Sequence, residues 1–487
     1  KPAFHIPVFR RVTVSETSNP PVGIDDIAIH FPRLYMDMKD FADLRGADYG
    51  KLSKGLGLEA MAIPDVHEDT ATMGAMAVMQ LIDRNGIDPR TIGRMYLGTE
   101  SALDGAKPTA TYIVDMLTQR YAERFGEDCF QTCDVVDMTF ACIGAVDALH
   151  TTLDWVARSN ANDERLGIVI FSDNAKYALE SSGEYTQGAG GGAGQTLKKG
   201  LVERMIRHLP KSTVRKLGIF AHGEEKVSVH RDDPVFDGQF SNLCYQNAVR
   251  QAFFDFSNKA ERAGRIKPGT DKPFTEQWSR IIMHLPYAYQ AKRMFPDVFR
   301  HDREHTDMWN DVVEAIGPMP SQPESTDADA LNAWEREKDA YRRLISKTPQ
   351  YTEFHASRIE KGQRASSLIG NQYTGSIFLA LMSTFESDLE DNSNLDNAMF
   401  GMCGYGSGAK AKVFEGKVSP RWREVVASWH LFERLAGRMA IDHITYENLH
   451  KGTQDNSVIE PKGEFALVDI GEEGVDEGAR RYRWIKA

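Results

Sequence analysis

The sequence is poor in cysteine and has no long apolar run. Five cysteines among 487 residues are an odd number, and their spacing matches no zinc-binding pattern. We therefore expect reduced thiols, no bound metal and a cytoplasmic location. No stretch approaches the roughly 18 apolar residues that span a bilayer, and the first residues lack the apolar core of a signal peptide. The sequence thus predicts no membrane partner.

A concentrated basic segment is also missing. Asp and Glu number 70 against 58 Lys and Arg, which gives a net charge of −12. Without a block of Lys and Arg there is no footprint for a phosphate backbone, so nucleic acid is not an expected partner. Hydrophobic residues make up 41% and charged residues 26%, which is ordinary for a globular protein. The length is enough for about two to four domains.

The familiar nucleotide and hydrolase motifs are absent as well. The sequence contains no G-x-x-x-x-G-K-[ST], H-E-x-x-H or G-x-S-x-G pattern. Gly188–Ala193 (GAGGGA) fits a loose dinucleotide pattern, but the preceding strand pattern ends near Phe171 and no apolar helix pattern follows. A dinucleotide loop must join a strand directly to a helix. We therefore interpret this segment as a glycine-rich turn.

The first half of the chain alternates strand and helix patterns. Leu166–Phe171 (LGIVIF) is typical of a buried strand, and Thr70–Asn85 carries apolar residues at helical spacing. This alternation predicts an α/β fold with mostly parallel strands. The other strands are expected at 23–31 and 94–97, and the other helices at 38–44, 107–125 and 141–157.

The second half echoes the first. Arg280–Leu285 resembles the strand at 94–97, because both are short and apolar and end at an ionisable residue. Tyr373–Phe385 resembles the helix at 141–157 in its small-residue entry and apolar body. These likenesses favour two similar α/β halves packed face to face. The highly charged stretch at about 300–347 is expected to be a helical surface insertion.

Three reactive side chains stand where buried structure meets a turn. Cys142 begins an apolar helix, where the helix dipole and free N–H groups are expected to lower the thiol pKa. Glu100 follows a buried strand, and His284 ends another. Each has a common structural interpretation, since buried Cys is usually inert and such His residues are usually structural. Together they fit acyl transfer followed by carbanion chemistry.

A set of motifs in a fixed order carries a resemblance to a known family. The set resembles the hydroxymethylglutaryl-CoA synthase family of thiolase-like condensing enzymes, from about Gly23 to about Gly408, less clearly at 195–230 and 300–350. The motifs are GLGLEAMAIPDVHEDTATM (55–73), GTESALDGAK (98–107), DMTFACIGA (137–145), FSDNAKYAL (171–179), SGEYTQGAG (182–190), DDPVFDGQFSNLCY (232–245), MHLPY (283–287), GNQYTGS (370–376) and GYGSG (404–408).

The resemblance implies a thiolase-like fold, with two similar halves in a layered α-β-α-β-α arrangement. It also implies a homodimer. The implied division is a lead-in at 1–20, an N-terminal half at 21–195 with Glu100 and Cys142, a variable connection at 196–230, and a C-terminal half at 231–487 with His284, Asn371 and the charged insertion.

The resemblance further implies a two-step condensation. Cys142 would take an acetyl group from acetyl-CoA as a thioester, and Glu100 would remove a proton from its methyl group. The resulting carbanion would attack acetoacetyl-CoA, which His284 binds and polarises. Water would then release 3-hydroxy-3-methylglutaryl-CoA, a mevalonate-pathway product. The CoA esters are substrates, so no cofactor is expected.

Further substrate contacts are implied for the residues around these three. They are Asn371, Tyr177, Tyr373, and Gly406 and Ser407 of the glycine-rich loop. The developing negative charge on the thioester oxygen needs fixed donors. We expect them to be the backbone N–H of Cys142 and one from the turn at 406–408.

Two departures from the family pattern stand out. The family places a Lys five residues after its His, where this chain has Tyr289, so Lys292 and Arg293 are expected to reach the CoA phosphates. The family also follows its Q-G-A-G stretch with an apolar strand. This chain has GGAGQTLKK there, so we expect that strand to be weakened, shifted or lost.

Three interpretations stay open. The first, which we favour, is a synthase that acts on free CoA esters. The second is a β-branching synthase of a polyketide pathway, whose substrate is held by an acyl carrier protein. The third is an inactive homologue that serves as an interaction protein.

Overall fold

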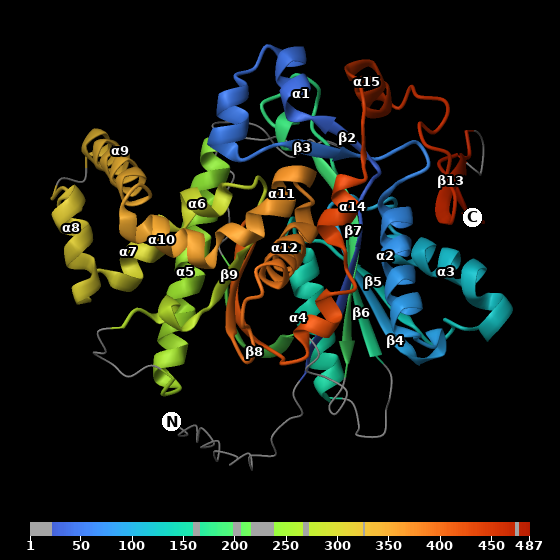
Figure 1. Cartoon of the computed structure of the whole chain (residues 1–487), viewed down its shortest axis with the longest axis horizontal. Coiled ribbons are helices and arrows are strands. Elements are labelled where there is room, and N and C mark those ends of the chain that lie inside the picture. Colours follow the sequence, from blue (N-terminus) through green and yellow to red (C-terminus); the bar gives the residue numbers. More distant parts are fainter. Residues whose placement is uncertain are drawn as a thin grey trace, which may run out of the picture.

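The computed structural model describes residues 22–158, 166–197, 206–215, 238–265, 272–324, 327–472 and 477–487. The expected lead-in at 1–20 lies outside these residues. Helices and strands alternate around one large sheet (Figure 1). Within the described ranges, every helix is too short or too polar to cross a membrane.

A nine-stranded sheet forms the centre of the protein. Its order is β5-β4-β6-β7-β1-β8-β11-β10-β9. The strands are β1 (Gly23–His30), β4 (Ile92–Gly98), β5 (Asp134–Met138), β6 (Leu166–Ala175), β7 (Gly188–Leu197), β8 (Ile206–Arg215), β9 (Arg280–Met283), β10 (Met399–Gly406) and β11 (Lys410–Val418).

The sheet consists of two matching halves. The order β4-β6-β7-β1 on one side is repeated by β9-β10-β11-β8 on the other. Within the sheet, the halves join where Gly23 and Ile24 of β1 pair with Arg207 and Ile206 of β8. The expected pair of similar α/β halves is therefore confirmed.

The strand directions differ from the prediction. The pairs β4–β5, β4–β6 and β9–β10 are parallel, but β7 and β11 run antiparallel to both of their neighbours. The sheet is therefore mixed, and the expectation of mostly parallel strands is wrong. The physical reason is that β7 and β11 follow β6 and β10 without a crossover helix, and such a connection makes neighbouring strands antiparallel.

The glycine-rich segment is a central strand and not a turn. It forms β7, which pairs with β1 and β6 along its length. A Cβ added at Gly192 would lie 1.9 Å from the Phe171 ring, and one at Gly191 would lie 2.5 Å from the backbone of Met73. Glycine is needed here because helix and strand approach too closely for side chains. Both expectations for this segment, a turn and a weakened strand, are wrong.

Five layers of structure stack across the two halves. Helices α2 (Thr70–Asn85) and α3 (Thr109–Phe125) cover the outside of one half, and α5 (Gly238–Arg262) covers the other (Figure 1). Helices α4 (Gly144–Arg158) and α12 (Ser376–Glu390) lie between the halves. The α-β-α-β-α arrangement implied by the resemblance is thus present.

Side chains from both halves meet in this middle layer. The ring of Phe171 on β6 stacks on Phe378 of α12 with centroids 4.5 Å apart. Val146 of α4 lies next to Gly404 of β10, where an added Cβ would be 3.4 Å from the valine. The middle helices therefore contact both halves of the sheet.

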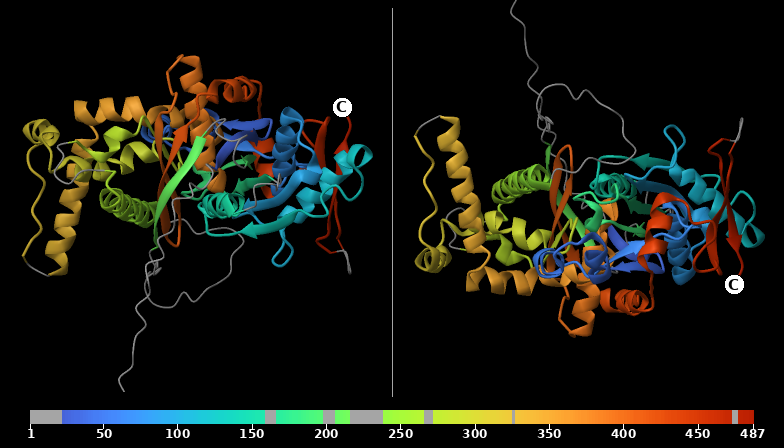
Figure 2. Two further views of the ribbon diagram at one scale, coloured as in Figure 1. Left: turned by 90° about the horizontal axis from the view of Figure 1, so that it is seen from below. Right: turned by 90° about the horizontal axis from the view of Figure 1, so that it is seen from above.

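A run of helices follows β9. Of these, α8 and α9 pack together and project at the end of the molecule away from the C-terminus (Figure 2). Tyr341 of α9 donates to the carbonyl of Gly317, 2.9 Å away, and so ties the connecting segment to the helix. The helices are α6 (Gln290–Met294), α7 (Pro296–Arg303), α8 (Asn310–Ile316), α9 (Ala328–Ile345), α10 (Pro349–Arg358) and α11 (Gln363–Ile369).

Smaller elements cover the top of the molecule in Figure 1, where α1 contacts α15. A three-stranded sheet supports α1. These elements are β2 (Leu34–Asp37), β3 (Ala60–Ile63), β12 (Met439–Ala440), α1 (Met38–Arg45) and α15 (His443–Lys451). The other elements of the C-terminal part are α13 (Trp422–Val426), α14 (Leu431–Ala436), β13 (Glu464–Ile470) and β14 (Arg480–Ile485).

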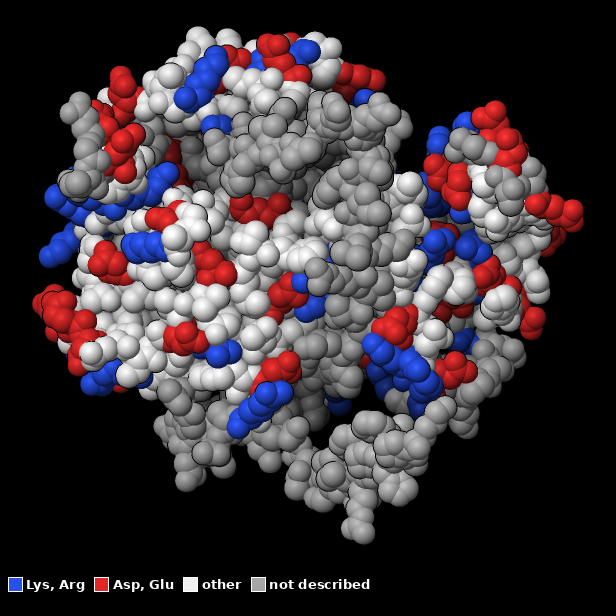
Figure 3. Space-filling view, turned by 180° about the vertical axis from the view of Figure 1, so that it is seen from behind, with Lys and Arg blue, Asp and Glu red and all other residues white. Residues whose placement is uncertain are grey.

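The charged side chains on the back face are mixed in sign. Figure 3 shows acidic and basic groups interspersed over that face. Neighbouring opposite charges screen each other, so the face presents no continuous field of one sign.

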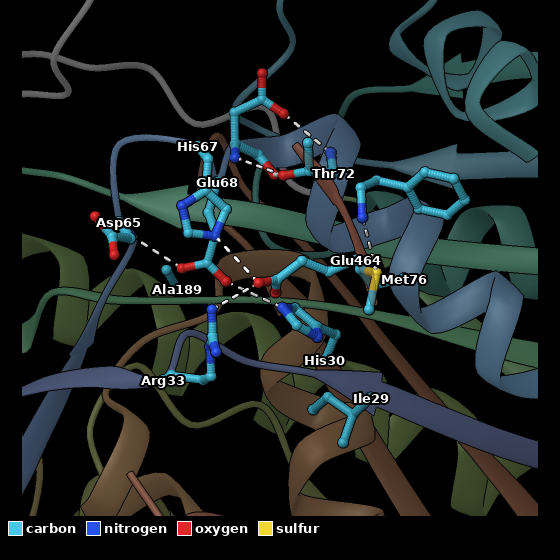
Figure 4. A network of polar contacts seen from close by, with 12 residues as sticks. Ile29, His30, Arg33, Asp65, His67, Glu68, Thr72, Met76, Ala189 and Glu464 are labelled. Carbon is cyan, nitrogen blue, oxygen red and sulfur yellow. Dashed lines mark hydrogen bonds and ion pairs between the residues drawn. The ribbon is translucent and has the colours of Figure 1, made fainter. Parts of the chain in front are cut away.

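A buried polar network ties the C-terminal segment to the first half. His30 contacts Glu68 at 3.1 Å, and Arg33 donates to Glu464 at 2.6 Å. Asp65 accepts from the backbone of Val458 at 2.9 Å. Figure 4 shows these side chains converging between strand, loop and C-terminal segment. Because buried charges need partners, the network fixes the path of the last residues.

Candidate active site

Cys142 lies just before α4, at the centre of the molecule. The preceding residue, Ala141, has a φ of 42°, which turns the chain sharply before the helix begins at Gly144. The end of β4 touches this turn, because a Cβ added at Gly98 would lie 2.1 Å from the backbone nitrogen of Ala145. Glycine at position 98 therefore allows the strand end to approach the cysteine.

Glu100 and Cys142 form a hydrogen-bonded pair. The Glu100 side chain faces solvent on one side and is otherwise enclosed by protein. Loss of hydration and the charge of Asp173 raise the pKa of Glu100 to about 8. Loss of hydration, followed by Glu100 itself, raises the pKa of the Cys142 thiol well above its usual value.

The expected lowering of the thiol pKa is therefore wrong. The helix begins two residues after Cys142, and helix-dipole effects fall off within a turn. Burial and the nearby carboxyls outweigh what remains of that effect. The thiol is thus protonated and needs a base, and its hydrogen bond to Glu100 supplies one.

Asp173, at the end of β6, holds the site together and was not predicted. Its Oδ1 accepts from Thr99 Oγ1 at 2.9 Å, from the Glu100 N–H at 2.7 Å and from the Ser101 N–H at 3.1 Å. Its Oδ2 accepts from the N–H of Thr374 at 3.0 Å and contacts the Thr374 hydroxyl at 2.5 Å. Burial raises the pKa of Asp173 to about 6. One carboxylate thus links the two halves directly behind Glu100.

The expected tyrosines form an aromatic wall beside the thiol. Tyr177 and Tyr373 meet edge to face with centroids 6.3 Å apart, and Cys142 packs against this cluster. Asn371 accepts from the Tyr373 N–H at 2.9 Å and hydrogen-bonds to the Tyr177 hydroxyl. The structure therefore brings these three predicted residues to the cysteine.

His284 is buried in the second half with its backbone firmly held. Its N–H donates to the carbonyl of Cys403 at 3.1 Å, and its carbonyl accepts from the Tyr245 hydroxyl at 2.8 Å. Neither ring nitrogen has a partner among the described residues. Burial lowers the pKa of His284 to about 3, so the imidazole is neutral. A neutral ring with open nitrogens can donate to or accept from a ligand.

The glycine-rich loop lies against the cysteine turn. A Cβ added at Gly406 would lie 2.7 Å from the Phe140 carbonyl oxygen and 2.9 Å from the Ile143 nitrogen. Ser407 is exposed, and its side chain hydrogen-bonds to Tyr405. The loop that was expected to supply the second backbone donor is therefore next to Cys142.

Lys292 and Arg293 are outside the cysteine cluster. Both are exposed on α6, and Arg293 donates to the carbonyl of Gly55 at 2.8 Å. Gly55 ends a short π-helix, η1 (Lys51–Gly55), whose Lys51 and Lys54 are also exposed. These two lysines were not predicted, because their position beside α6 comes from tertiary packing.

The fold and the site together define a class. Two matching α/β halves enclose a pair of central helices, and a cysteine with a hydrogen-bonded carboxyl lies at the start of one of them. A histidine follows the matching strand, and its ring nitrogens have no partner in the described part of the chain. These features define a thiolase-like condensing enzyme.

The particular family follows from comparison with known sequences. Residues 19–197 match the family model "Hydroxymethylglutaryl-coenzyme A synthase N terminal", and residues 226–459 match the corresponding C-terminal model. The hydroxymethylglutaryl-CoA synthase of Haloferax volcanii is 30% identical over 472 residues, which cover 96% of this chain and 99% of the relative. The chain belongs to the hydroxymethylglutaryl-CoA synthase family.

Solved structures agree with this assignment. MvaS in complex with 3-hydroxy-3-methylglutaryl coenzyme A aligns with a TM-score of 0.76 and 26% identity, covering 96% of this chain and 99% of that one. The hydroxymethylglutaryl synthase of the curacin biosynthetic pathway aligns at 0.70 and 18% identity, covering 96% and 100%. At that identity the second likeness concerns the fold alone.

Proposed function

We propose that this protein condenses acetyl-CoA with acetoacetyl-CoA to give 3-hydroxy-3-methylglutaryl-CoA and CoA. The observation that carries the proposal is the hydrogen-bonded Glu100–Cys142 pair. It is close to His284, whose ring nitrogens have no partner among the residues that the structure describes. Tyr405 links the two, because its ring centroid is 6.4 Å from that of His284 and it interacts electrostatically with Cys142. The presence of all three reactive groups disfavours an inactive interaction protein.

In the first step, Glu100 takes the thiol proton while Cys142 Sγ bonds to the acetyl carbonyl carbon. The carbonyl carbon then loses its bond to the CoA sulfur. CoA leaves as a thiol and carries that proton away, so Glu100 is again a carboxylate. The negative oxygen of the tetrahedral intermediate is stabilised by backbone donors of Cys142 and the Gly406 loop, each worth roughly 10²–10³ in rate.

In the second step, Glu100 removes a proton from the methyl group of acetyl-Cys142. The carbon that loses it attacks the ketone carbon of acetoacetyl-CoA and forms the new carbon–carbon bond. His284 donates a hydrogen bond to the ketone oxygen, and because the ring is neutral it polarises the carbonyl without supplying a full charge. The alkoxide takes its proton back from Glu100.

In the third step, water attacks the remaining thioester to Cys142. The carbon–sulfur bond breaks, one proton of the water goes to the thiol and the other is released to solvent, so the product leaves with a free carboxylate. Tyr177, Tyr373 and Asn371 enclose the thioester in the earlier steps, which limits access of water until the condensation is complete.

The CoA phosphates would bind at the exposed basic cluster beside the loop that carries Tyr177. Arg293 interacts electrostatically with Tyr185 of that loop. Lys292 is next to Arg293 on α6, and Lys51 and Lys54 are on η1 with Gly55, to which Arg293 donates. Basic side chains of this kind form charge-assisted bonds with phosphate.

The acetoacetyl group could be carried by CoA or by an acyl carrier protein. A carrier-bound acetoacetyl group would need the same chemistry but a protein contact in place of the basic cluster. Turnover of acetoacetyl-CoA against carrier-bound acetoacetate distinguishes the two. We favour free CoA because the sequence contains no Lys- and Arg-rich segment of the kind that would bind an acidic carrier protein.

We also propose a cytoplasmic homodimer. The edge strand β5 has exposed residues, including Val136 with 37% of its surface accessible. Exposed sheet edges are commonly covered by a partner. Sedimentation at micromolar concentration checks this, and a monomer there would contradict it.

Mass spectrometry after incubation with acetyl-CoA tests the core of the proposal. We expect one acetyl group, on Cys142, and formation of the six-carbon product when acetoacetyl-CoA is added. Acetylation elsewhere would overturn the role of Cys142. Acetylation without condensation would overturn the proposed reaction while leaving that role intact.

A further inference from the structure

The loop that carries Tyr177 is fixed from behind by helices far away in the sequence. This segment, residues 177–187, is called here the Tyr177 loop. Its front contributes the tyrosine that packs against Tyr373 and Cys142. Its back contacts α15 and α1, which lie together at the top of Figure 1.

A buried chain of hydrogen bonds runs from α15 to the backbone of Tyr177. Tyr446 is fully buried, and its hydroxyl accepts from Gln187 Nε2 at 2.8 Å. The carbonyl oxygen of the same Gln187 side chain accepts from the Tyr177 N–H at 2.8 Å. The orientation of this amide is set by both contacts, so Tyr446 determines which of its atoms faces Tyr177.

The same hydroxyl is held on its other side by an ion pair. Tyr446 donates to Glu184 Oε1 at 2.8 Å, and Arg45 of α1 donates to both oxygens of Glu184, the shortest contact being 2.8 Å. Glu184 also accepts from the N–H of Glu180 at 2.6 Å. The donor and acceptor roles of the Tyr446 hydroxyl are therefore both fixed.

His450, one turn further along α15, holds the remaining peptide group. Its Nε2 donates to the carbonyl of Tyr177 at 2.8 Å and lies 3.1 Å from Gln187 Oε1. Both the N–H and the carbonyl of Tyr177 are thus anchored by side chains of Gln187 and His450. Buried networks with every partner satisfied rigidify the backbone they hold.

We propose that Tyr446 and His450 are positioning residues that hold Tyr177 over acetyl-Cys142 and keep water from the thioester. The inference rests on the proposed function and extends it to the choice between condensation and hydrolysis. If the Tyr177 loop loosens, the aromatic wall opens beside Cys142. Water then attacks acetyl-Cys142 and gives acetate before acetoacetyl-CoA reacts.

The test is the partition of acetyl-enzyme between product and acetate in Tyr446→Phe. This variant keeps the buried ring and removes only the hydroxyl. We expect the ratio of acetate to product to rise about fivefold or more, because the variant loses the hydroxyl contacts to Gln187 and Glu184, with a loss of Tm similar to that of a matched control. The matched control is Tyr121→Phe on α3, a buried tyrosine whose hydroxyl donates to Asp83 at 2.7 Å. Its ratio should equal that of wild type.

A double-mutant cycle separates positioning from a general structural effect. In a Tyr177→Ala background the wall is already gone, so Tyr446→Phe should add nothing to the hydrolysis ratio. Independent effects that multiply would overturn the proposal, as would a wild-type ratio in Tyr446→Phe alone. Where Tyr446→Phe fails to fold, His450→Leu decides in the same way, with an expected rise of about threefold to fivefold.

Failure of the proposed function has a different signature. A wild-type protein that takes up acetyl but makes no condensation product refutes that function. Release of acetate from acetyl-Cys142 still measures the effect of Tyr446 in that case. A faster release in Tyr446→Phe would support the positioning role, and an unchanged release would overturn it.

Discussion

The two halves have the same backbone turn before their central helices, but the side chains that follow the turn differ. Ala141 and Tyr373 have φ values of 42° and 41°, and each lies three residues before its central helix. The next residue is Cys142 in the first half and Thr374 in the second. The Thr374 hydroxyl contacts Asp173 and the carbonyl of Gly98. The same sharp turn thus presents the thiol of Cys142 in one half and a hydroxyl that links the halves in the other.

The residues that follow the equivalent strands β4 and β9 also differ between the two halves. Glu100 follows β4, and His284 follows the equivalent strand β9. Burial acts on both, but it raises the pKa of the carboxyl and lowers that of the imidazole. We infer that the first half moves protons and forms the thioester, while the second half binds and polarises the second substrate.

The largest effect is expected when the thiol is moved from position 142 in the first half to position 374 in the second. Cys142→Ala should lose acetyl uptake and condensation, by about 10⁴-fold or more, because a covalent nucleophile cannot be replaced by binding alone. Adding Thr374→Cys to that variant should restore neither, since position 374 faces Asp173 and not Glu100. Cys244→Ala is the control and should acetylate normally. Acetylation at position 374, read by mass spectrometry, would break the comparison.

The next test removes the two strand-end groups separately. Glu100→Gln should lower condensation by about 10³-fold or more, because both proton transfers pass through this carboxyl. Acetyl uptake should fall less, since CoA esters are already activated. His284→Ala should leave acetyl uptake unchanged and reduce the second step by about 10²-fold. Loss of acetyl uptake in His284→Ala would show that the halves are not divided in this way.

The positions of the reactive groups were predictable, but their environment was not. Helix α2 has the predicted bounds, because its apolar spacing and its Asp69 cap are both local signals. Strand β7 was missed because its glycines serve the close packing of Met73 and Phe171, which are distant in sequence. Strand direction was missed because it depends on how strands connect, which the alternation of elements does not specify.

The same limit applies within the site. Glu100, Cys142 and His284 could be named because Glu100 and His284 follow predicted strands and Cys142 precedes a predicted helix. Asp173 and Thr374 could not, since their importance lies in a contact across the two halves. The thiol pKa was misjudged for a related reason, because the carboxyls that raise it come from other segments.

The pH dependence gives a third test of the division. A base must be deprotonated to act, so a pKa of Glu100 raised to about 8 means that the condensation rate increases with pH up to about 8. Below that value it should fall about tenfold per pH unit. His284, with a pKa of about 3, should add no limb near neutrality. His284→Gln should therefore keep the profile shape, and an acid limb near pH 4.5 in wild type would contradict the raised pKa.

A smaller effect is expected from cutting the link between the halves. Thr374→Val removes the hydroxyl contacts to Asp173 and Gly98, which should destabilise the fold by about 1–3 kcal/mol because Asp173 is buried. Thr384→Val on α12 is the control, since its hydroxyl donates to the carbonyl of Ala380 in its own helix. Urea unfolding measures both. Equal stability losses would show that Asp173 does not couple the halves.

The smallest expected effect comes from basic residues in the segments that follow the equivalent strands β4 and β9. Lys107, after β4, lies 3.3 Å above the Tyr112 ring, and Lys292, after β9, lies 5.3 Å from the Tyr289 ring. Both lysines are exposed, but only Lys292 is next to Arg293, which contacts Gly55 of η1.

Lys292→Ala and Arg293→Ala should each raise KM for CoA esters about fivefold to thirtyfold, as loss of a charge-assisted contact predicts. The kcat should hardly change, because such binding is equal in ground and transition states. Lys107→Ala should change neither constant. If all three variants behave like wild type while carrier-bound acetoacetate is turned over faster than acetoacetyl-CoA, the second half recognises an acyl carrier protein and not a CoA phosphate.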